Sequence, residues 1–309
     1  MVKWQGREES SNIEDRRGQG GIGGGGGLGG GFNPGGFGGG GFRLPSGRSG
    51  MSMGGIAVLV VFVLIAMAFG INPIDLLTGS DTSQSSSAST QTTLPPQNAT
   101  EDDLRQFVGV VVKDTETFWT GYFQQHGGTY TDPKVVLYSG QTQSGCGTAD
   151  SSAGPFYCPV DQKVYIDLSF YQQLRDQFGA PGDFAQAYVI AHEVGHHVQD
   201  LLGILPAFNK ARQTLTQDQA NAYSVKIELQ ADCFAGMWGQ GEFKQGYLDD
   251  GDVQEAINAA NQIGDDTLSQ NTISPRQYTH GSSAQRMQWF KTGYQATDVH
   301  QCDTGLPAY

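Results

Sequence analysis

The sequence predicts an α+β domain that is mainly helical, contains a small sheet and occupies residues 101–309 of the 309-residue chain. Two observations indicate this fold class. Several stretches of the domain have apolar residues at helical spacing and are bounded by capping residues, glycine or proline. Two short runs rich in β-branched residues precede these stretches, which indicates a small sheet at the N-terminal side of the domain.

The predicted elements follow in a simple order along the domain. The strands are expected at 135–138 and 164–168, and the second run alternates apolar with polar residues. The helices are expected at 183–202, 216–238, 252–263 and 283–291. Asp183 is the expected N-cap of the first helix, and Thr216 opens the second through a capping-box pattern with Gln219.

The segments before the domain have low complexity. Residues 1–50 are predicted to be a disordered, glycine-rich cytoplasmic tail, because 19 of the 45 glycines lie between Gly18 and Gly50 without apolar periodicity. Residues 73–100 are rich in Ser, Thr and Pro and are predicted to be a stalk. The first 50 residues carry a net charge of +2 and the remainder −15. An acidic main body argues against nucleic acid as a partner.

Residues 51–72 are predicted to form a single transmembrane helix. Within them, 19 residues at 53–71 carry no charge and would span roughly 28 Å as a helix. The alternative is a cleaved signal peptide, since residues 66–68 resemble a cleavage site, but about 50 preceding residues are too many for a normal leader. Arg43 and Arg48 precede the span, so the positive-inside rule places the N-terminus in the cytoplasm and the domain outside.

All four cysteines lie in the predicted domain, beyond the membrane span. An even number of cysteines in an exported domain predicts two disulfides. The expected pairs are Cys146 with Cys158, which bracket a Gly/Ser-rich loop, and Cys233 with Cys302, which would pin the C-terminal tail to a helix. The alternative is four free thiols in a reducing compartment.

The first predicted helix carries the motif His-Glu-Val-Gly-His at 192–196. Residues four apart share one helix face, so His192 and His196 can both direct their imidazoles at one Zn²⁺ per chain. Glu193 is placed to reach a water beside that metal. The alternative is a chance cluster on a solvated face. The flanking residues are apolar, however, and burying three such groups without partners would cost several kcal/mol.

A catalytic zinc needs three protein ligands and an open position. One class of peptidases places a third histidine six residues after the second, but Leu202 stands there and excludes that arrangement. The second predicted helix carries Glu228 and Asp232 on one face. We expect Glu228 to be the third ligand and Asp232 to accept the far N–H of a ligand histidine. The alternative is that both are surface charges, although large apolar residues follow them.

With Glu228 and Asp232 downstream of His-Glu-Val-Gly-His, the sequence resembles the gluzincin pattern of membrane peptidases. It resembles more closely the bacterial putative neutral zinc metallopeptidase family. The stretches that match this family are 4–7, 10–12, 182–188, 192–199 and 279–283. The resemblance implies a zincin-like fold and a single-pass zinc peptidase of the bacterial cytoplasmic membrane. The catalytic domain would be periplasmic or extracytoplasmic, and the substrate a protein or peptide.

A late Thr-His-Gly segment containing His280 also has a counterpart in the gluzincin membrane peptidases, where Thr-His-Pro precedes an arginine at a similar distance. Here Gly281 replaces the proline, and the arginine is Arg286. By this analogy, His280 or Arg286 would donate to the developing oxyanion. The alternative is that Ser282 or Ser283 caps a short helix and Arg286 pairs with a surface acid.

The expected reaction is amide hydrolysis with zinc on His192, His196 and Glu228 and with Glu193 as general base. Residues 164–168 are the candidate strand for holding extended substrate, and are equally consistent with a buried hairpin. The rival function is a non-catalytic, zinc-containing membrane scaffold or binding protein. A structural zinc would have four protein ligands, whereas the sequence offers three and a base, which favours the enzyme.

Overall fold

The computed structural model describes residues 1–18, 100–249 and 251–306. The predicted transmembrane segment 51–72 and nearly all of the predicted stalk 73–100 lie outside these described residues. Among the helices of the described part, none is long and apolar enough to cross a membrane. The described part is mainly helical with a small sheet, so the predicted fold class is confirmed at this level.

A four-stranded sheet with the order β1-β2-β6-β5 forms one layer of the fold. Strands β1, β2 and β6 are parallel, and β5 runs antiparallel to β6. A separate two-stranded sheet pairs β3 with β4. The strands are Ile13–Asp15 (β1), Lys134–Tyr138 (β2), Gln141–Ser144 (β3), Gly147–Asp150 (β4), Phe156–Cys158 (β5) and Lys163–Asp167 (β6).

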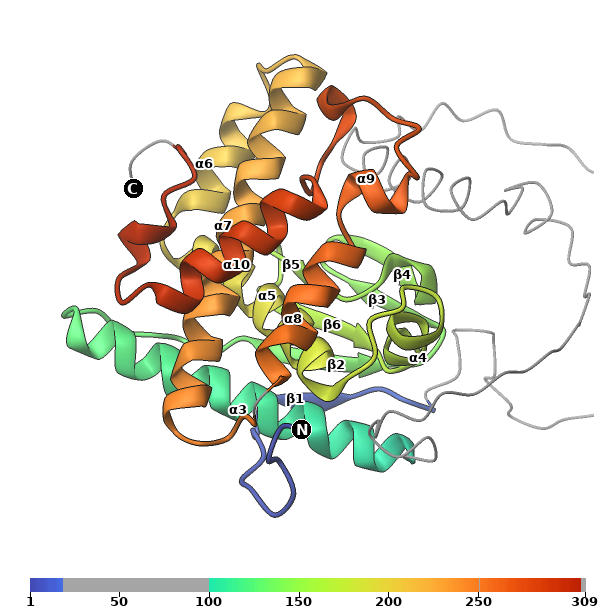
Figure 1. Cartoon of the computed structure of the whole chain (residues 1–309), viewed down its shortest axis with the longest axis vertical. Helices are drawn as coiled ribbons and strands as arrows, with labels where there is room; N and C mark the ends of the chain where they lie inside the picture. Colours follow the sequence, from blue (N-terminus) through green and yellow to red (C-terminus); the bar gives the residue numbers. More distant parts are fainter. Residues whose placement is uncertain (19–99, 250, 307–309) are drawn as a thin grey trace, which may run out of the picture.

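The helices enclose α5, which lies at the centre of the fold (Figure 1). It contacts α7 and α8 on one side and strands β5 and β6 on the other. The helices are Glu101–Gln125 (α3), Ser169–Asp176 (α4), Asp183–Leu201 (α5), Ile204–Ala211 (α6), Gln217–Lys244 (α7), Asp252–Gln262 (α8), Asp265–Leu268 (α9) and Ser283–Gln295 (α10). Short 3₁₀ turns occupy 151–153, 275–277 and 299–302.

The four predicted helices correspond to α5, α7, α8 and α10, and both Thr216 and Ser282 cap their helices with a capping box. The predicted role of Asp183 as N-cap is wrong, because Gly182 occupies that position. Glu255 of α8 instead accepts the N–H of Phe184 at 3.1 Å. A Cβ on Gly182 would lie 2.2 Å from Glu255 Oε2, so only glycine allows α8 to cap α5 in this way.

The strand predicted at 164–168 is β6, and it lies inside the sheet. Its backbone is paired with β2 on one side and with β5 on the other. All of its residues except Lys163 are buried, so both of its faces are covered. It therefore cannot accept an extended substrate along its main chain, and the alternative of a buried hairpin, formed with β5, is the correct one.

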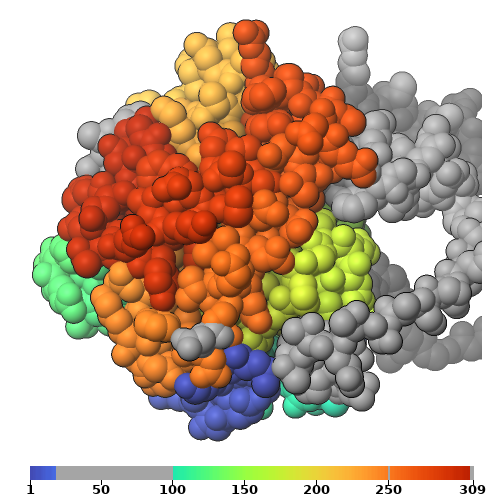
Figure 2. Space-filling view, viewed as in Figure 1, coloured from blue at the N-terminus to red at the C-terminus, as the bar shows by residue number. Residues whose placement is uncertain are grey.

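The predicted disorder of residues 1–50 is wrong for residues 1–18, while 19–50 lie outside the described residues. β1 pairs with β2 between Ile13↔Val135 and Asp15↔Leu137. Figure 2 shows these N-terminal residues lying against the C-terminal end of α7 and the loop that follows it. Composition was misleading here because the segment has no core of its own, and its partners in the domain are more than 80 positions away in the sequence.

Candidate metal centre

The metal centre depends on a close approach between α5 and α7. Gly195, in the middle of the His-Glu-Val-Gly-His motif, faces the backbone of Ala231 on α7. A Cβ at Gly195 would stand 3.1 Å from the Ala231 carbonyl oxygen and 3.2 Å from its Cα. Glycine therefore lets the two helix backbones come together, and this brings the acids of α7 within reach of the histidines of α5.

The structure brings His192, His196 and Glu228 together. One ligand atom from each lies within 4.8 Å of the others. Glu228 Oε2 is 3.1 Å from His192 Nε2, and Glu228 Oε1 is 3.5 Å from His196 Nε2. Two imidazole nitrogens and a carboxylate from three turns of two helices thus converge on one point, as the sequence predicted.

Each candidate ligand histidine is oriented by a hydrogen bond at its Nδ1 atom. Asp232 Oδ1 lies 2.8 Å from His192 Nδ1, and because a carboxylate only accepts, that nitrogen carries the proton. Gln199 Oε1 lies 2.8 Å from His196 Nδ1. The amide of Gln199 is oriented by its own N–H bonds to the Ile227 carbonyl at 2.8 Å and to Gln230 at 3.0 Å. With Nδ1 of each ring occupied in this way, both histidines direct Nε2 towards Glu228, and Nε2 is the atom that each can offer to a metal.

The electrostatics of the cluster favour a cation. Burial acts to lower the pKa of His192, but the carboxylates of Asp232 and Glu228 raise it to about 10. At His196, burial is the largest effect on the pKa and lowers it, which keeps that imidazole neutral. Burial acts to raise the pKa of Glu228, but the neighbouring histidines hold it well below its usual range. The excess negative charge stabilises a proton in the absence of metal, and equally a divalent ion.

Asp232 is the centre of a fully buried network. Its side chain accepts hydrogen bonds from Tyr188 Oη at 2.5 Å and from Arg286 Nε and Nη2 at 2.9 Å each. Burial acts to raise its pKa, but Arg286 and His192 bring it down to about 2. Asp232 therefore remains a carboxylate and keeps His192 in the tautomer that a metal ligand needs.

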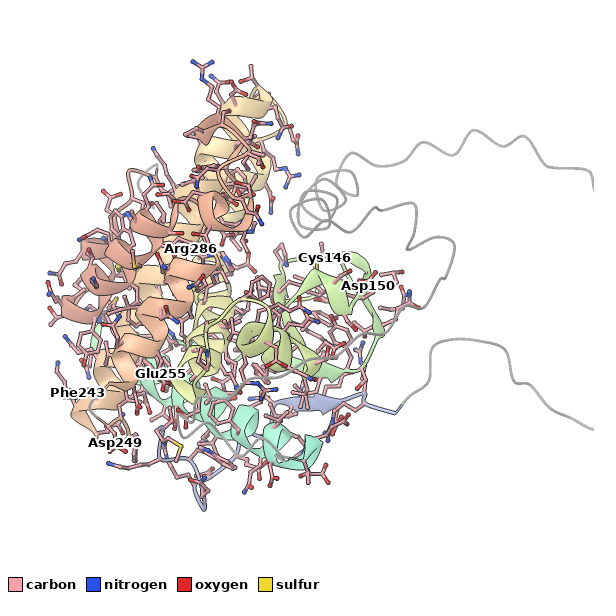
Figure 3. All side chains as sticks on the ribbon, turned by 45° about the vertical axis from the view of Figure 1, so that its right-hand side comes forward. Cys146, Asp150, Phe243, Asp249, Glu255 and Arg286 are labelled. Atoms are coloured by element: carbon pink, nitrogen blue, oxygen red, sulfur yellow. A yellow bond between two sulfur atoms is a disulfide. The ribbon has the colours of Figure 1, made fainter. Side chains whose placement is uncertain are left out.

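Arg286 does not have the position that the oxyanion role requires. It projects from α10 (Figure 3) and is 3% exposed. Nε, Nη1 and Nη2 all donate within the protein, to Asp232, to the Ile263 carbonyl at 3.2 Å and to Tyr188 Oη at 3.3 Å. The alternative of a surface ion pair is also wrong, since its partner acid is buried. Arg286 is a positioning residue that neutralises Asp232.

Glu193 lies beside the ligand cluster and is 8% exposed. Burial raises its pKa to about 7, while the charge of His192 acts in the opposite direction. Its carboxylate also accepts a backbone N–H from Tyr157 of β5. A carboxylate with this pKa can take and return a proton near neutral pH.

His280 is oriented by a residue that sequence reasoning missed. Asp265 Oδ2 accepts three consecutive backbone N–H groups, from Thr279 and His280 at 2.7 Å and from Gly281 at 3.0 Å. Asp265 Oδ1 lies 3.2 Å from His280 Nδ1. Burial acts to lower the pKa of His280, but Glu228 and Asp265 raise it. Gly281 has φ = 95°, a conformation that the proline of the related segment could not adopt.

His197 is not part of the metal cluster. It is buried, and its ring nitrogens lie 2.7 Å from the Thr131 carbonyl and 3.2 Å from Tyr157 Oη. The outer edge beside the cluster is β5, since β6 is already paired on both sides. Tyr157 of β5 therefore contacts both Glu193 and His197, and β5 replaces residues 164–168 as the candidate strand for an extended substrate.

Both predicted disulfides are present, Cys146–Cys158 and Cys233–Cys302. Cys233 follows Asp232 on α7, so the second disulfide ties the C-terminal segment to the helix that carries the acids of the site. It lies in an apolar cluster with Trp119, Val194 and Phe234. This cluster packs behind the metal centre and supports the α5–α7 contact.

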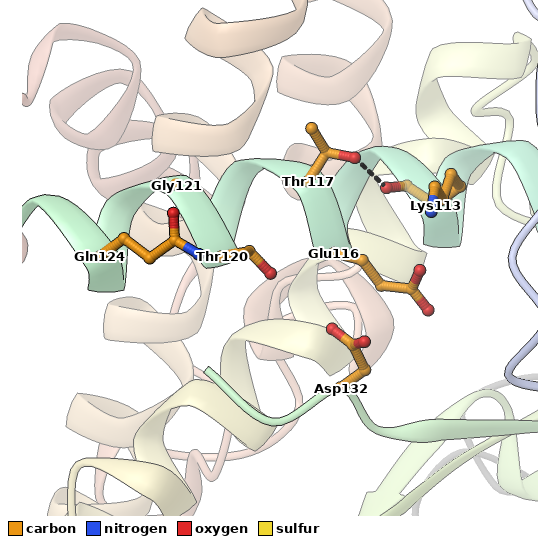
Figure 4. A pocket seen from close by; sticks show the side chains of 7 residues that line it. All are labelled: Lys113, Glu116, Thr117, Thr120, Gly121, Gln124 and Asp132. Atoms are coloured by element: carbon orange, nitrogen blue, oxygen red, sulfur yellow. Dashed lines mark hydrogen bonds between the residues drawn. The ribbon is translucent and has the colours of Figure 1, made fainter. Parts of the chain in front are cut away.

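A surface groove of about 350 Å³ lies elsewhere, along α3 (Figure 4). None of its lining residues belongs to the metal cluster. They are Lys113, Glu116, Thr117, Thr120, Gly121, Gln124 and Asp132.

The donor set fits zinc. Two neutral imidazoles and one carboxylate are the ligands of many catalytic zinc sites, and three ligands leave the fourth tetrahedral position for water or substrate. The hydrogen-bonded Nδ1 atoms of both histidines complete the second layer that such sites require.

Comparisons with known proteins agree with this chemistry. A family model described as a putative neutral zinc metallopeptidase matches residues 2–305. The uncharacterized protein YpfJ of Escherichia coli strain K12 is 48% identical over 309 residues, covering 98% of each chain. The uncharacterized protein Rv2575 of Mycobacterium tuberculosis strain H37Rv is 47% identical over 189 residues, which cover 57% of this chain and 63% of the relative. No solved structure matches the chain.

Proposed function

This chain belongs to the putative neutral zinc metallopeptidase family, and from that premise we propose that it hydrolyses peptide bonds at the cluster of His192, His196 and Glu228. The observation that carries the proposal is the combination of three converging ligand atoms with a buried glutamate whose pKa is about 7. A structural site needs no such base, and it would have four protein ligands.

The side chains of the site have different roles in the proposed reaction. His192, His196 and Glu228 would hold one Zn²⁺, which when bound supplies the Lewis acidity that polarises a carbonyl and activates water near neutral pH. Glu193 takes a proton from the attacking water and returns it to the leaving amine. Asp232 and Gln199 keep both imidazoles in the required tautomer.

His280 is the remaining candidate for the oxyanion. Asp265 holds its backbone and its Nδ1, so Nε2 is free to donate elsewhere. The raised pKa of His280 favours the protonated ring, which is the form that can donate to a developing negative charge. We propose His280, rather than Arg286, as the donor.

The proposed substrate is a protein or peptide bound in extended form along β5. Association with a bacterial membrane through residues 51–72 is also part of the proposal, supported by the 19 uncharged residues at 53–71. The two disulfides support an extracytoplasmic location for the zinc domain, because disulfides persist in oxidising compartments.

The test compares zinc content with turnover in one preparation. The purified full-length chain should contain one zinc per chain by elemental analysis and should cleave a quenched casein substrate. Glu193→Gln should keep the zinc and lose about 10²–10⁴-fold in kcat, whereas Glu8→Gln, a change at an exposed glutamate, should behave like wild type. Full turnover by Glu193→Gln would refute the assigned base. A zinc-loaded wild type without turnover on a peptide library would favour the scaffold.

A further inference from the structure

The N-terminal segment, residues 1–18, is bound to the zinc domain through its backbone. Besides the β1–β2 pairing, Ser10 N–H donates to the Gly109 carbonyl of α3 at 2.9 Å, and Lys3 N–H donates to the Tyr247 carbonyl at 2.9 Å. Arg16 N–H donates to the Leu137 carbonyl at 2.7 Å. These bonds spread over almost the whole segment, so it is held along its length and not only at one end.

Buried charges of the domain depend on this segment. Arg7 Nη2 lies 2.5 Å from Asp114 Oδ1 on α3, and Arg7 Nη1 lies 3.9 Å from Glu242 Oε2 on α7. Asp114 is 7% exposed and Glu242 is 1% exposed. The guanidinium also stacks on the Tyr247 ring, 3.4 Å from its centroid. Without Arg7, two adjacent carboxyl groups would be buried with no counter-charge, which proteins rarely tolerate.

A second polar contact repeats this pattern nearby. Glu116 of α3 is buried, and its Oε1 accepts hydrogen bonds from Ser10 Oγ at 2.5 Å and from Asn12 Nδ2 at 2.9 Å. Glu9 and Glu14 in turn pair with Arg105 and Lys163, both at 2.8 Å. Charges on the segment thus pair with opposite charges on the domain. These pairs explain why the segment is bound, although its composition predicts that it would be solvated.

Apolar contacts complete the interface. Val2 is 4% exposed and belongs to the main hydrophobic core, and its N–H donates to Asp183 at the start of α5. Trp4 packs edge-on against Phe107 of α3, with ring centroids 5.9 Å apart. Glycine inside a helix is costly, yet Gly109 stands inside α3, where a Cβ would lie 3.0–3.2 Å from the Glu9 side chain.

From these contacts we propose that residues 1–18 are an integral part of the zinc domain and lie on the same side of the membrane as the metal cluster. Hydrogen bonds of about 3 Å cannot form across a hydrocarbon layer of about 30 Å. A single crossing by residues 53–71 would separate the two parts. The cytoplasmic N-terminus with an external domain, as predicted from the charge bias, is therefore incompatible with this fold.

Two single-cysteine variants of the full-length chain test the proposal in intact bacterial cells. Ser11→Cys places a thiol on the exposed surface of the segment, and Asp218→Cys places one on the exposed surface of the domain. Cells are treated with a membrane-impermeant maleimide before and after permeabilisation, and the chain without added cysteine gives the background. We expect both positions to be labelled alike in intact cells, whether both react or both are protected. Labelling of one with protection of the other would overturn the proposal.

A second measurement tests the docking itself, independently of any membrane. Arg7→Ala should lower the midpoint of thermal unfolding by about 6 °C or more, because it leaves Asp114 and Glu242 without their counter-charge. The matched control is Arg175→Ala, since Arg175 pairs only with its exposed neighbour Asp176 and should change the midpoint little. Equal midpoints for the two variants would show that the segment is not bound, and would overturn the proposal.

Discussion

Replacing Arg286 with methionine tests the assignment of that residue as the counter-charge of Asp232. The substitution keeps a long side chain of similar volume and removes the guanidinium. Asp232 is 0% exposed and Arg286 is 3% exposed, and two hydrogen bonds of 2.9 Å join them. Breaking a buried pair of this kind by removing one partner costs about 3–5 kcal/mol. For a domain of this size, that corresponds to a fall of roughly 6–20 °C in Tm.

The same change should weaken metal binding. Without Arg286, the pKa of Asp232 rises because His192 alone remains to oppose the effect of burial, and the carboxylate holds His192 less firmly. Loss of a partner behind a metal ligand typically lowers affinity by about 10–100-fold. Chemical unfolding gives the stability change, and competition with a zinc chelator gives the affinity. Arg276→Met is the matched control, since Arg276 is exposed.

A double-mutant cycle with Asp232→Asn identifies the partner. If Arg286 acts through Asp232, its loss should cost much less in the Asp232→Asn background than in wild type. One outcome would refute the reasoning. If Arg286→Met kept wild-type stability and zinc affinity while kcat alone fell, Arg286 would act on the reacting group, as the analogy with the gluzincins suggested.

Two further variants probe the surroundings of the site, and a third probes the buried carboxyl group beside Arg7. Asp265→Asn should leave zinc binding unchanged but lower kcat and shift the basic limb of its pH profile to lower pH, because His280 must be protonated to donate and loses the carboxylate that orients it and raises its pKa. Gly195→Ala should cost about 1–3 kcal/mol and weaken zinc binding, because its Cβ would push against the Ala231 backbone. Burial raises the pKa of Glu242 above its usual 4.5 despite Arg7, so the folded state retains a proton that the unfolded state releases. The free energy of unfolding should therefore fall as pH rises from 4.5 through the folded pKa, and Glu242→Gln should flatten that slope.

For each of these variants, one result would contradict the prediction. Zinc loss on Asp265→Asn would mean that Asp265 supports the ligands rather than His280. Gly195→Ala is compared with Gly121→Ala on α3, where nothing lies within 4 Å of the added Cβ. Alanine there should stabilise the helix by up to about 1 kcal/mol, and equal effects at both positions would exclude the close-approach argument. Identical pH slopes for wild type and Glu242→Gln would show that this carboxyl ionises freely.

The chemistry of the site was readable from local spacing. A period of 3.6 residues places His192 beside His196 and Glu228 beside Asp232 whatever the rest of the fold does. The two helix starts at Thr216 and Ser282 follow from capping boxes that involve only four residues each. Thr100 and Asp103 form the same kind of capping box at the start of α3.

Other features depended on partners distant in sequence. From the sequence, Gln199 would be taken for a surface amide. In the structure, hydrogen bonds to Ile227 and Gln230 orient it towards His196. Strand 164–168 could be assigned, but its central position depends on which strands pair with it. Nothing near Arg286 in the sequence indicates that Asp232, 54 residues away, accepts its hydrogen bonds.

The sequence by itself predicted the candidate metal ligands, the candidate base and the disulfide partners, because these depend on short-range geometry and residue chemistry. Only the tertiary structure decided that Arg286 serves Asp232, that β5 is the outer strand beside the site, and that residues 1–18 belong to the zinc domain. Arg7 shows the physical reason. From the sequence, a charged side chain in a glycine-rich region is expected to be solvated. Arg7 is bound only because α3 and α7 bury two carboxyl groups at the same place.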